Sequence, residues 1–249
     1  MITQERLQKV IAASGRYSRR QAEELIKQGK VIVDGKKITQ LGSKVNPQQS
    51  RIVVCGRLIF NRAQKKYFLF HKPRQCMVTR DDPEGRKTIY DYLPQKMKNF
   101  KPVGRLDYDS EGLLLLTNDG ELAQKLTHPQ FHIEKIYEVK VVSKPHLRQL
   151  ERLRTGFELD GRKTLPMKVD IIDENPKSTW LSMVLHEGRN RQIRRMCDKV
   201  GLTVKTLVRT QFGPFALKGI PYAKYKEVSL NLTPFVSRFI PRIRYEKAV

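Results

Sequence analysis

Three acidic side chains are crowded into one short stretch of an otherwise basic chain. Asp107, Asp109 and Glu111 fall within five residues, between two glycines. Four consecutive leucines follow, and the Asn-Asp-Gly sequence at 118–120 is typical of a turn. The leucine block is too short for a helix and indicates a buried strand. A carboxylate on a tight loop beside such a strand can act as a nucleophile or as a general base.

Four arginines form a second cluster that could take part in chemistry. Arg189, Arg191, Arg194 and Arg195 fall within seven residues, after a glycine and at the start of a predicted helix. An arginine-rich helix start can bind anions, and an arginine within ion-pairing distance would keep a carboxylate ionised and oriented. The alternative interpretation is a solvated basic helix face.

The sequence carries no motif for a nucleotide, a dinucleotide cofactor or a catalytic metal. The five histidines are scattered, and the three cysteines are far apart, so neither a catalytic triad nor a zinc site has support. We therefore expect no cofactor and no metal. One carboxylate without a cofactor restricts the reaction to hydrolysis, or to addition and isomerisation at a base, and residue spacing does not choose between them.

The charge balance indicates a polyanionic partner. The chain has 249 residues, with 49 Lys and Arg against 25 Asp and Glu, which gives a net charge of +24. Lysine and arginine contacts to phosphates release counterions, so this excess favours nucleic acid, although an ordinary alkaline surface is the alternative. Unpaired cysteines, the lack of a secretory signal and the lack of a run of ~18 apolar residues predict a cytoplasmic chain with no membrane contact. A monomer is the default expectation.

The elements that must position the two clusters lie in a larger domain predicted at residues 67–235. Many strands with a few interspersed helices predict an α+β fold with a mixed, largely antiparallel sheet and a central cleft. The polar residues 61–66 are typical of a linker, and residues 236–249 form a basic tail. The predicted strands are 67–70, 113–117, 134–142, 169–172 and 180–185, and the predicted helices are 121–126, 145–153 and 191–200.

Residues 1–60 predict a separate small basic module of two helices and short strands. Ser18 and Gln21 fit a capping box for a helix at 19–28, and the Asp-Gly pair at 34–35 predicts a two-residue hairpin turn. Basic side chains in the first turn of that helix oppose its dipole, which favours a functional reason for them. We expect one RNA-binding face from Arg19, Arg20, Lys27 and Lys30.

The order of these residues resembles a known RNA-binding module. Residues 7–12, 18–23 and 29–35 are similar to the α-L RNA-binding domain first described in ribosomal protein S-four. The resemblance covers most of the first 50 residues. It implies an accessory domain that binds RNA, and it does not by itself imply catalysis.

The larger domain resembles the ribosomal-RNA pseudouridine synthases, in the RsuA/RluB/RluE/RluF group. The resemblance rests on residues 104–107 and 112–114 together with 187–196, and it continues through 72–73, 117–120, 128–129, 135–137 and 209–210. It implies an isomerase that converts a uridine of ribosomal RNA, more often 23S than 16S, to pseudouridine without a cofactor. A non-catalytic RNA-binding protein is the competing class, but it would gain nothing from three acids facing phosphate.

The resemblance also implies roles for individual residues. Asp107 matches the essential aspartate of the family, and Arg105 matches the arginine of the same motif. Tyr137 matches the tyrosine that stacks on the target base. Arg194 matches the basic residue that pairs with the aspartate, and Ile193 matches an apolar residue of the pocket.

Further basic residues of the larger domain are expected to contact RNA, and one position departs from the family. The expected RNA contacts here are Lys72, Arg189, Arg191 and Arg195. Two residues after Pro73 the family usually has glycine, and this chain has Gln75. That departure bears on the geometry of a peripheral turn.

Overall fold

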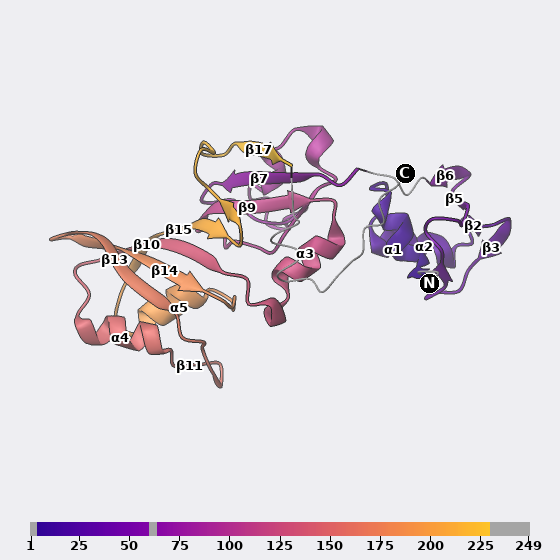
Figure 1. The fold of residues 1–249 in the computed structure, drawn as a ribbon. Helices are drawn as coiled ribbons and strands as arrows, with labels where there is room; N and C mark the ends of the chain where they lie inside the picture. Colours follow the sequence, from indigo (N-terminus) through magenta and orange to yellow (C-terminus); the bar gives the residue numbers. More distant parts are fainter. Residues whose placement is uncertain (1–3, 60–63, 230–249) are drawn as a thin grey trace. The chain divides into compact units, whose positions relative to one another are not determined.

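The computed structural model describes residues 4–59 and 64–229 (Figure 1). The chain divides into two compact units, Met1–Lys65 and Lys66–Val249. The basic tail expected at 236–249 and the first half of the linker expected at 61–66 lie outside the described residues. No helix in the described parts is long and apolar enough to cross a membrane.

The first unit packs two helices against short strands, and the local sequence signals explain why. The capping box at the start of the second helix is present, because Gln21 N donates to the Ser18 hydroxyl and Ser18 N donates to the Gln21 side chain. Asp34 and Gly35 both have positive φ, as a two-residue hairpin turn requires. Its elements are β1 (Glu5–Arg6), α1 (Leu7–Ala13), α2 (Arg19–Lys27), β2 (Val31–Val33), β3 (Lys36–Ile38), β4 (Lys44–Val45), β5 (Ile52–Val54) and β6 (Arg57–Ile59).

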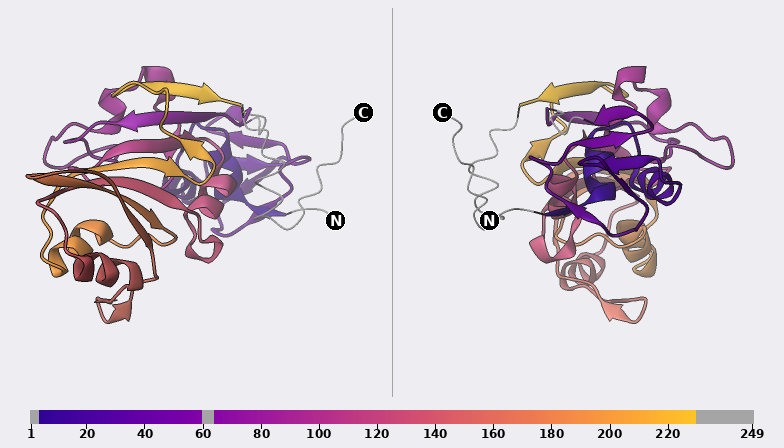
Figure 2. Two further views of the ribbon diagram at one scale, coloured as in Figure 1. Left: turned by 60° about the vertical axis from the view of Figure 1, so that its left-hand side comes forward. Right: turned by 90° about the vertical axis from the view of Figure 1, so that its right-hand side faces the viewer.

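The second unit is built on a nine-stranded sheet in the order β13-β14-β10-β15-β9-β7-β17, with β8 and β16 as short additions. Figure 2 shows the yellow β17 beside the purple β7 at one end of the stack. The pairing is antiparallel except between β9 and β15, which confirms the predicted α+β fold with a mixed sheet. The strands are β7 (Tyr67–Lys72), β8 (Lys101–Pro102), β9 (Glu111–Thr117), β10 (Lys135–Val142), β13 (Lys168–Asn175), β14 (Ser178–Leu185), β15 (Val204–Phe212), β16 (Phe215–Ala216) and β17 (Tyr225–Val228).

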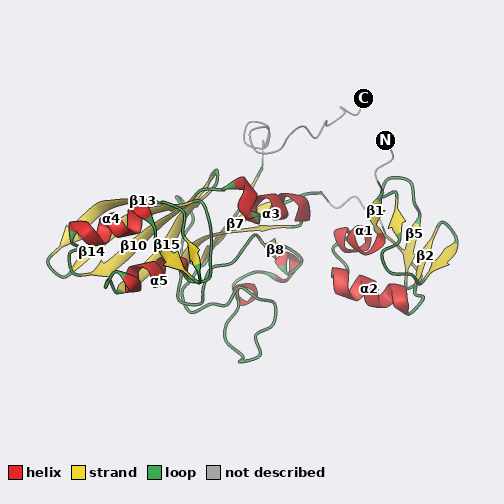
Figure 3. Cartoon of the chain, turned by 90° about the horizontal axis from the view of Figure 1, so that it is seen from below, coloured by secondary structure: helices red, strands yellow, loops and turns green. Residues whose placement is uncertain are grey.

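Three α-helices, three short 3-10 helices (Ile89–Asp91, Gln95–Met97 and Pro129–Phe131) and a small hairpin complete the described part of the second unit. The α-helices and the hairpin cover or flank the sheet. They are α3 (Gly120–Thr127), α4 (Leu147–Thr155), α5 (Gln192–Lys199) and the hairpin of β11 (Glu158–Leu159) with β12 (Arg162–Lys163). Apolar residues of α4 and α5 share one core with β10, β13 and β14, and the two helices lie side by side across these strands (Figure 3). Helix α3 packs instead against β7 and β9.

The leucine block is a strand buried on both faces. Leu113 and Leu115 belong to the core under α3, whereas Leu114 and Leu116 belong to a second core formed with residues 89–97. All four side chains are fully buried. Because successive residues of a strand point to opposite faces, a strand covered on both sides has an unbroken apolar run.

The residues that surround the acidic loop lie in one row across the sheet. Lys72 of β7 is paired with Gly112 of β9, Gly112 with Arg209 of β15, and Arg209 with Tyr137 of β10. Gly112 has a φ of +118°, and a Cβ added there would lie 2.4 Å from the carbonyl oxygen of Arg209. The parallel contact between β9 and β15 therefore requires glycine at this position.

The close approach at Gly112 makes a testable prediction for stability. We expect Gly112→Ala to lower the free energy of unfolding by about 3 kcal/mol or more, because a side chain there meets backbone and the backbone is strained. Gly120→Ala is the matched control, since no atom lies within 4 Å of a Cβ at that helix start. Urea denaturation of both variants measures the difference. Equal stabilities would contradict the steric argument.

Candidate active site

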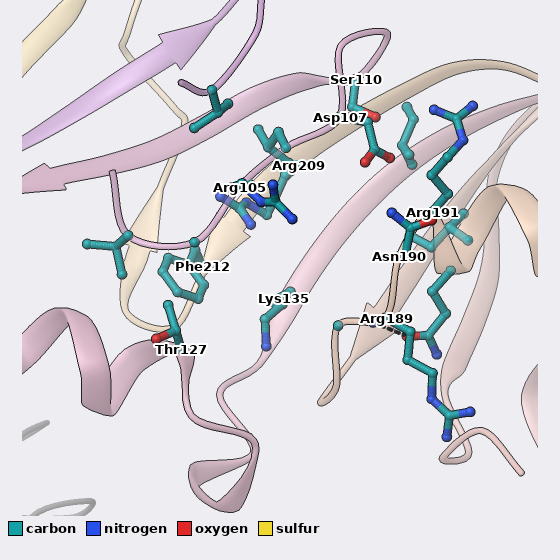
Figure 4. A pocket seen from close by; sticks show the side chains of 18 of the residues that line it. Arg105, Asp107, Ser110, Thr127, Lys135, Arg189, Asn190, Arg191, Arg209 and Phe212 are labelled. Atoms are coloured by element: carbon teal, nitrogen blue, oxygen red, sulfur yellow. Dashed lines mark hydrogen bonds between the residues drawn. The ribbon is translucent and has the colours of Figure 1, made fainter. Parts of the chain in front are cut away.

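A cavity of about 780 Å³ opens in the second unit in front of the acidic loop. Its walls come from that loop, from β10 and β15, from residues 185–193 and from the end of α3. Figure 4 shows Asp107, Arg105, Arg209 and Lys135 around the same space. Tyr137 and Ile193 also line it, so the structure brings together four of the five residues that the family resemblance implied.

The Asp107 carboxylate is available to a ligand. Within the described residues it accepts no hydrogen bond and forms no ion pair, although its backbone carbonyl accepts one from Lys72 Nζ at 3.0 Å and one from Ser110 N at 3.1 Å. The loop is thus fixed through its backbone while the side chain lies at the cavity. A half-buried carboxylate in this state can act as a base or as a nucleophile.

Lys72 holds the acidic loop in place. Its ammonium is completely buried and donates to the carbonyl oxygens of Pro73, Asp107 and Ser110 at 2.9, 3.0 and 2.8 Å. Burial lowers the pKa of Lys72 from 10.5 to about 8, and the nearby acids oppose this shift. The prediction that Lys72 contacts RNA is therefore wrong, because all three of its donors are used inside the protein.

The arginines of the second cluster reach the acidic loop at Asp109. Arg191 donates to both carboxylate oxygens of Asp109, at 3.0 and 3.1 Å, and Arg194 Nε lies 3.3 Å from Oδ2. Arg194 Nη2 also donates to the backbone oxygen of Asp109 at 3.0 Å. The expected pairing of Arg194 with Asp107 is therefore corrected, since the ion pair is formed with the acid two residues further on. The side chain of Arg194 does not line the cavity.

These contacts shift the pKa values of Asp109 and Arg194. Burial acts to raise the pKa of Asp109, but the hydrogen bonds from Arg191 and the charge of Arg194 outweigh it, so the pKa lies below 3.8. Burial lowers the pKa of the Arg194 guanidinium, and the charges of Asp109 and Asp107 oppose that shift. Asp107 thus lies within electrostatic range of Arg194 without a hydrogen bond to it.

Arg189 and Arg195 hold the β11–β12 hairpin. Arg189 donates to three backbone carbonyls of the hairpin, those of Leu159, Arg162 and Lys163, and pairs with Glu187. Arg195 makes a bidentate pair with Asp160 in the turn. These donors join α5 and the loop before it to the hairpin. The side chains of Arg189 and Arg195 keep 24% and 34% of their surface accessible, so their contact with RNA stays a prediction.

The other basic residues expected to bind RNA remain exposed. Arg191 keeps 44% of its side-chain surface accessible beside its pair with Asp109. In the first unit, Arg19, Arg20, Lys27 and Lys30 are exposed, and Lys27 lies 3.9 Å from Glu24. The structure leaves their proposed contact with RNA as a prediction.

Tyr137 and Ile193 supply the apolar part of the cavity wall. Tyr137 is partly buried and packs against the core that contains Ile193, which is 4% exposed. The α5 helix that carries Ile193 begins at Gln192, because Arg191 has a left-handed backbone with φ of 47°. That bend lets Arg191 turn toward the acidic loop while Ile193 packs inward.

Three cavity residues that were not among the expected site residues form a cluster: Lys135, Arg209 and Phe212. Lys135 Nζ lies 5.8 Å from the centre of the Phe212 ring, and the Arg209 guanidinium carbon lies 4.9 Å from it. A signal existed, since Lys135 precedes Tyr137 by two residues and therefore lies on the same face of the strand. Arg209 lies directly across the register from Tyr137.

Gln75 occupies the turn where the family usually has glycine. Its φ is 53°, in the left-handed region, and the side chain is exposed. The turn thus keeps a glycine-like backbone with a non-glycine residue, which carries a modest strain.

Comparison with known proteins identifies the family. The RNA pseudouridylate synthase family matches residues 66–199, and the S4 domain family matches residues 5–49. The chain belongs to the RNA pseudouridylate synthases, a family of isomerases, which confirms the resemblance seen in the sequence.

Individual relatives and a solved structure support the same family assignment. Ribosomal large subunit pseudouridine synthase B of Bacillus subtilis is 44% identical over 227 residues, which is 90% of this chain and 92% of the relative. The protein with the same description in Yersinia pestis is 35% identical, over 95% of this chain and 76% of the relative. A crystal structure of a pseudouridylate synthase superposes with a TM-score of 0.66 at 27% identity, covering 94% of this chain and 99% of that one.

The buried ammonium of Lys72 gives a second prediction. We expect Lys72→Met to destabilise the chain by about 3 kcal/mol or more, because three carbonyl groups lose their donor. Lys66→Met is the control, since Lys66 forms an exposed pair with Glu227 that should contribute less than about 1 kcal/mol. Urea denaturation compares them. A loss no greater than that of the control would show that the ammonium does not hold the loop.

The ion pairs at Asp109 give a third prediction. Asp109→Asn should lower the free energy of unfolding by about 1–2 kcal/mol, since two guanidinium groups lose their anion and partial exposure screens the effect. Asp160→Asn removes a fully exposed acid with a single arginine partner and should cost less. Thermal and urea denaturation at low salt would detect the order. The reverse order would argue against the pairing described here.

Proposed function

We propose that this chain converts a uridine in the RNA of the large ribosomal subunit to pseudouridine, with Asp107 as the catalytic residue. The two relatives described above carry the name ribosomal large subunit pseudouridine synthase B, and one is 44% identical over nearly the whole chain. The net charge of +24 and an S4 domain suit a ribosomal RNA target.

One observation carries the assignment of Asp107. Its carboxylate has no hydrogen-bond partner among the described residues and lies at a cavity of about 780 Å³, which is large enough for a nucleotide. Asp109, by contrast, is held by Arg191 and Arg194. A catalytic group must be free to contact the substrate, so Asp107 fits that role and Asp109 does not.

The substrate base must leave its stack to enter the cavity. Flipping costs a few kcal/mol in paired RNA and less in a loop. Tyr137 would offer a ring for the uracil to stack on, and Ile193 would complete an apolar wall. Arg105, exposed at the edge of the cavity, would contact the strand from which the base was drawn.

The reaction balances without a metal, a cofactor or a second substrate. The bond between uracil N1 and ribose C1′ breaks, the uracil turns within the cavity, and a bond forms between C5 and C1′. C5 loses its proton and N1 gains one, so atoms and electrons are conserved. Asp107 acts as a nucleophile or as a base in this exchange, and the surrounding side chains position it.

The remaining basic residues would bring RNA to the site. Arg191, partly exposed beside the cavity, would contact phosphate in addition to holding Asp109. The exposed basic residues of the S4 domain, Arg19, Arg20, Lys27 and Lys30, would supply a second surface. We further propose a monomer, and a ribosomal substrate would suit a cytoplasmic enzyme.

A pseudouridine map of ribosomal RNA tests the proposal. Carbodiimide mapping would compare cells that lack this protein with cells that carry the wild type or Asp107→Asn. We expect one or a few 23S positions to lose modification without the protein and to regain it only with the wild type. Purified Asp107→Asn should turn over more slowly by about 10³-fold or more, because a group that touches the reacting atoms is removed.

The control is RNA binding by the same variant. Asp107→Asn should retain nearly wild-type affinity for 23S RNA, since the substitution removes no cation. An unchanged map in both ribosomal subunits, or turnover of the variant within tenfold of the wild type, would refute the proposal.

A further inference from the structure

The cavity has a cationic end that the proposed reaction does not use. Lys135 of β10 and Arg209 of β15 both lie against the ring of Phe212, at 5.8 and 4.9 Å from its centre. Both side chains line the cavity, and Figure 4 shows Lys135 and Arg209 on the same side as Phe212. Asp107 lies at the other side of this space.

Neither cation has a carboxylate partner among the described residues. Lys135 donates only to the backbone oxygen of Ile133, at 2.6 Å, and Arg209 Nε donates to that of Leu113, at 2.9 Å. Glu187 is the acid whose charge acts on Lys135. Its oxygens already accept hydrogen bonds from Leu165 N, the Gln192 amide and Arg189 Nε.

Arg209 also leaves a donor unused. The residue is 3% exposed, and its buried Nη2 atom has no hydrogen-bond partner. Buried polar groups are nearly always satisfied, and an exception beside a cavity points to a ligand that is bound there in the working state. A positive charge with an unused donor selects for an anion.

We propose that Lys135, supported by the charge of Arg209 behind it, binds a phosphodiester group of the RNA strand next to the target nucleotide. This inference rests on the proposed function, because it takes the polyanion to be the RNA substrate. Lys135 and Tyr137 lie on the same face of β10, about 7 Å apart. A base stacked on Tyr137 thus places its own backbone near Lys135.

The electrostatic state of Lys135 fits an anion-binding role. Burial lowers the pKa of Lys135 to about 8, and the charge of Arg209 acts in the same direction while Glu187 opposes it. The other titratable groups that line the cavity are Arg86, Arg105, His128, His186, Arg189, Arg191, Asp81, Asp82, Asp107, Tyr108 and Tyr137. A phosphate would favour the charged ammonium, so RNA should bind less tightly as the pH rises above 8.

Salt dependence of binding tests the proposal. We would measure the affinity of wild type, Lys135→Met and Lys140→Met for an unmodified 23S transcript over a range of salt concentrations. Lys140 is the matched control, because it is on the same strand and lies over Trp180 at 5.5 Å but does not line the cavity. Lys135→Met should weaken binding severalfold and reduce the slope of log affinity against log salt by about 0.7–0.9.

A variant that retains the positive charge provides a second test of the phosphate contact. Lys135→Arg should restore the salt slope and remove the loss of affinity that the wild type shows between pH 7 and pH 9. A slope for Lys135→Met equal to that of Lys140→Met would overturn the phosphate contact. So would a fall in the maximal rate of Lys135→Met with unchanged affinity, since that result assigns the side chain to the chemical step.

Pseudouridine formation by the wild type on the same transcript separates the two proposals. An active wild type with no change of slope in Lys135→Met would refute the phosphate contact alone. An inactive wild type with the expected change of slope would refute the proposed substrate and leave Lys135 as an RNA phosphate contact.

Discussion

The candidate active site depends on one buried ammonium group. Lys72 donates to the backbone oxygens of Pro73, Asp107 and Ser110, so it joins the end of β7 to both ends of the turn that carries the acid. A charged group without water is costly to bury unless its donors are satisfied, and here all three are. The loop therefore has a fixed backbone without any demand on the Asp107 side chain. A carboxylate partner would have stabilised the charge of Lys72 more simply, but among the acids that act on it Asp107 has the largest effect, and Asp107 is the proposed catalytic group.

The sheet supplies the second constraint. Lys72, Gly112, Arg209 and Tyr137 lie in one row across four neighbouring strands. Neighbouring strands are about 4.8 Å apart, and β15 lies between β9 and β10. Tyr137 of β10 is therefore about 10 Å from the start of β9. The close parallel contact at Gly112 sets that spacing, because any side chain there would push β9 away from β15. The distance between Gly112, which follows the acidic loop, and Tyr137 is thus determined by backbone packing of the strands, which is more rigid than a loop.

Short-range patterns in the sequence predicted the local structure well. They did not predict which side chains pair or become buried when distant segments come together. The capping box at Ser18 and the doubly buried leucine strand follow from short-range rules that need no knowledge of the fold. Whether Arg194 pairs with Asp107 or with Asp109 depends on how a turn orients two acids only two residues apart, and spacing cannot decide that. The burial of Lys72 could not be predicted from the sequence either, because a lysine followed by a proline is typical of an exposed turn.

The two acids of the loop are separated by their partners. Arg191 and Arg194 neutralise Asp109 and hold its pKa low, so that acid is fixed in the charged state as a structural anchor. The same two cations interact with Asp107 only through space and do not occupy its oxygens. Had either arginine paired directly with Asp107, the substrate would have had to displace it. The anchor at Asp109 therefore stabilises the loop electrostatically and leaves the carboxylate of Asp107, the proposed catalytic group, free, which gives one short loop a use for more than one acid.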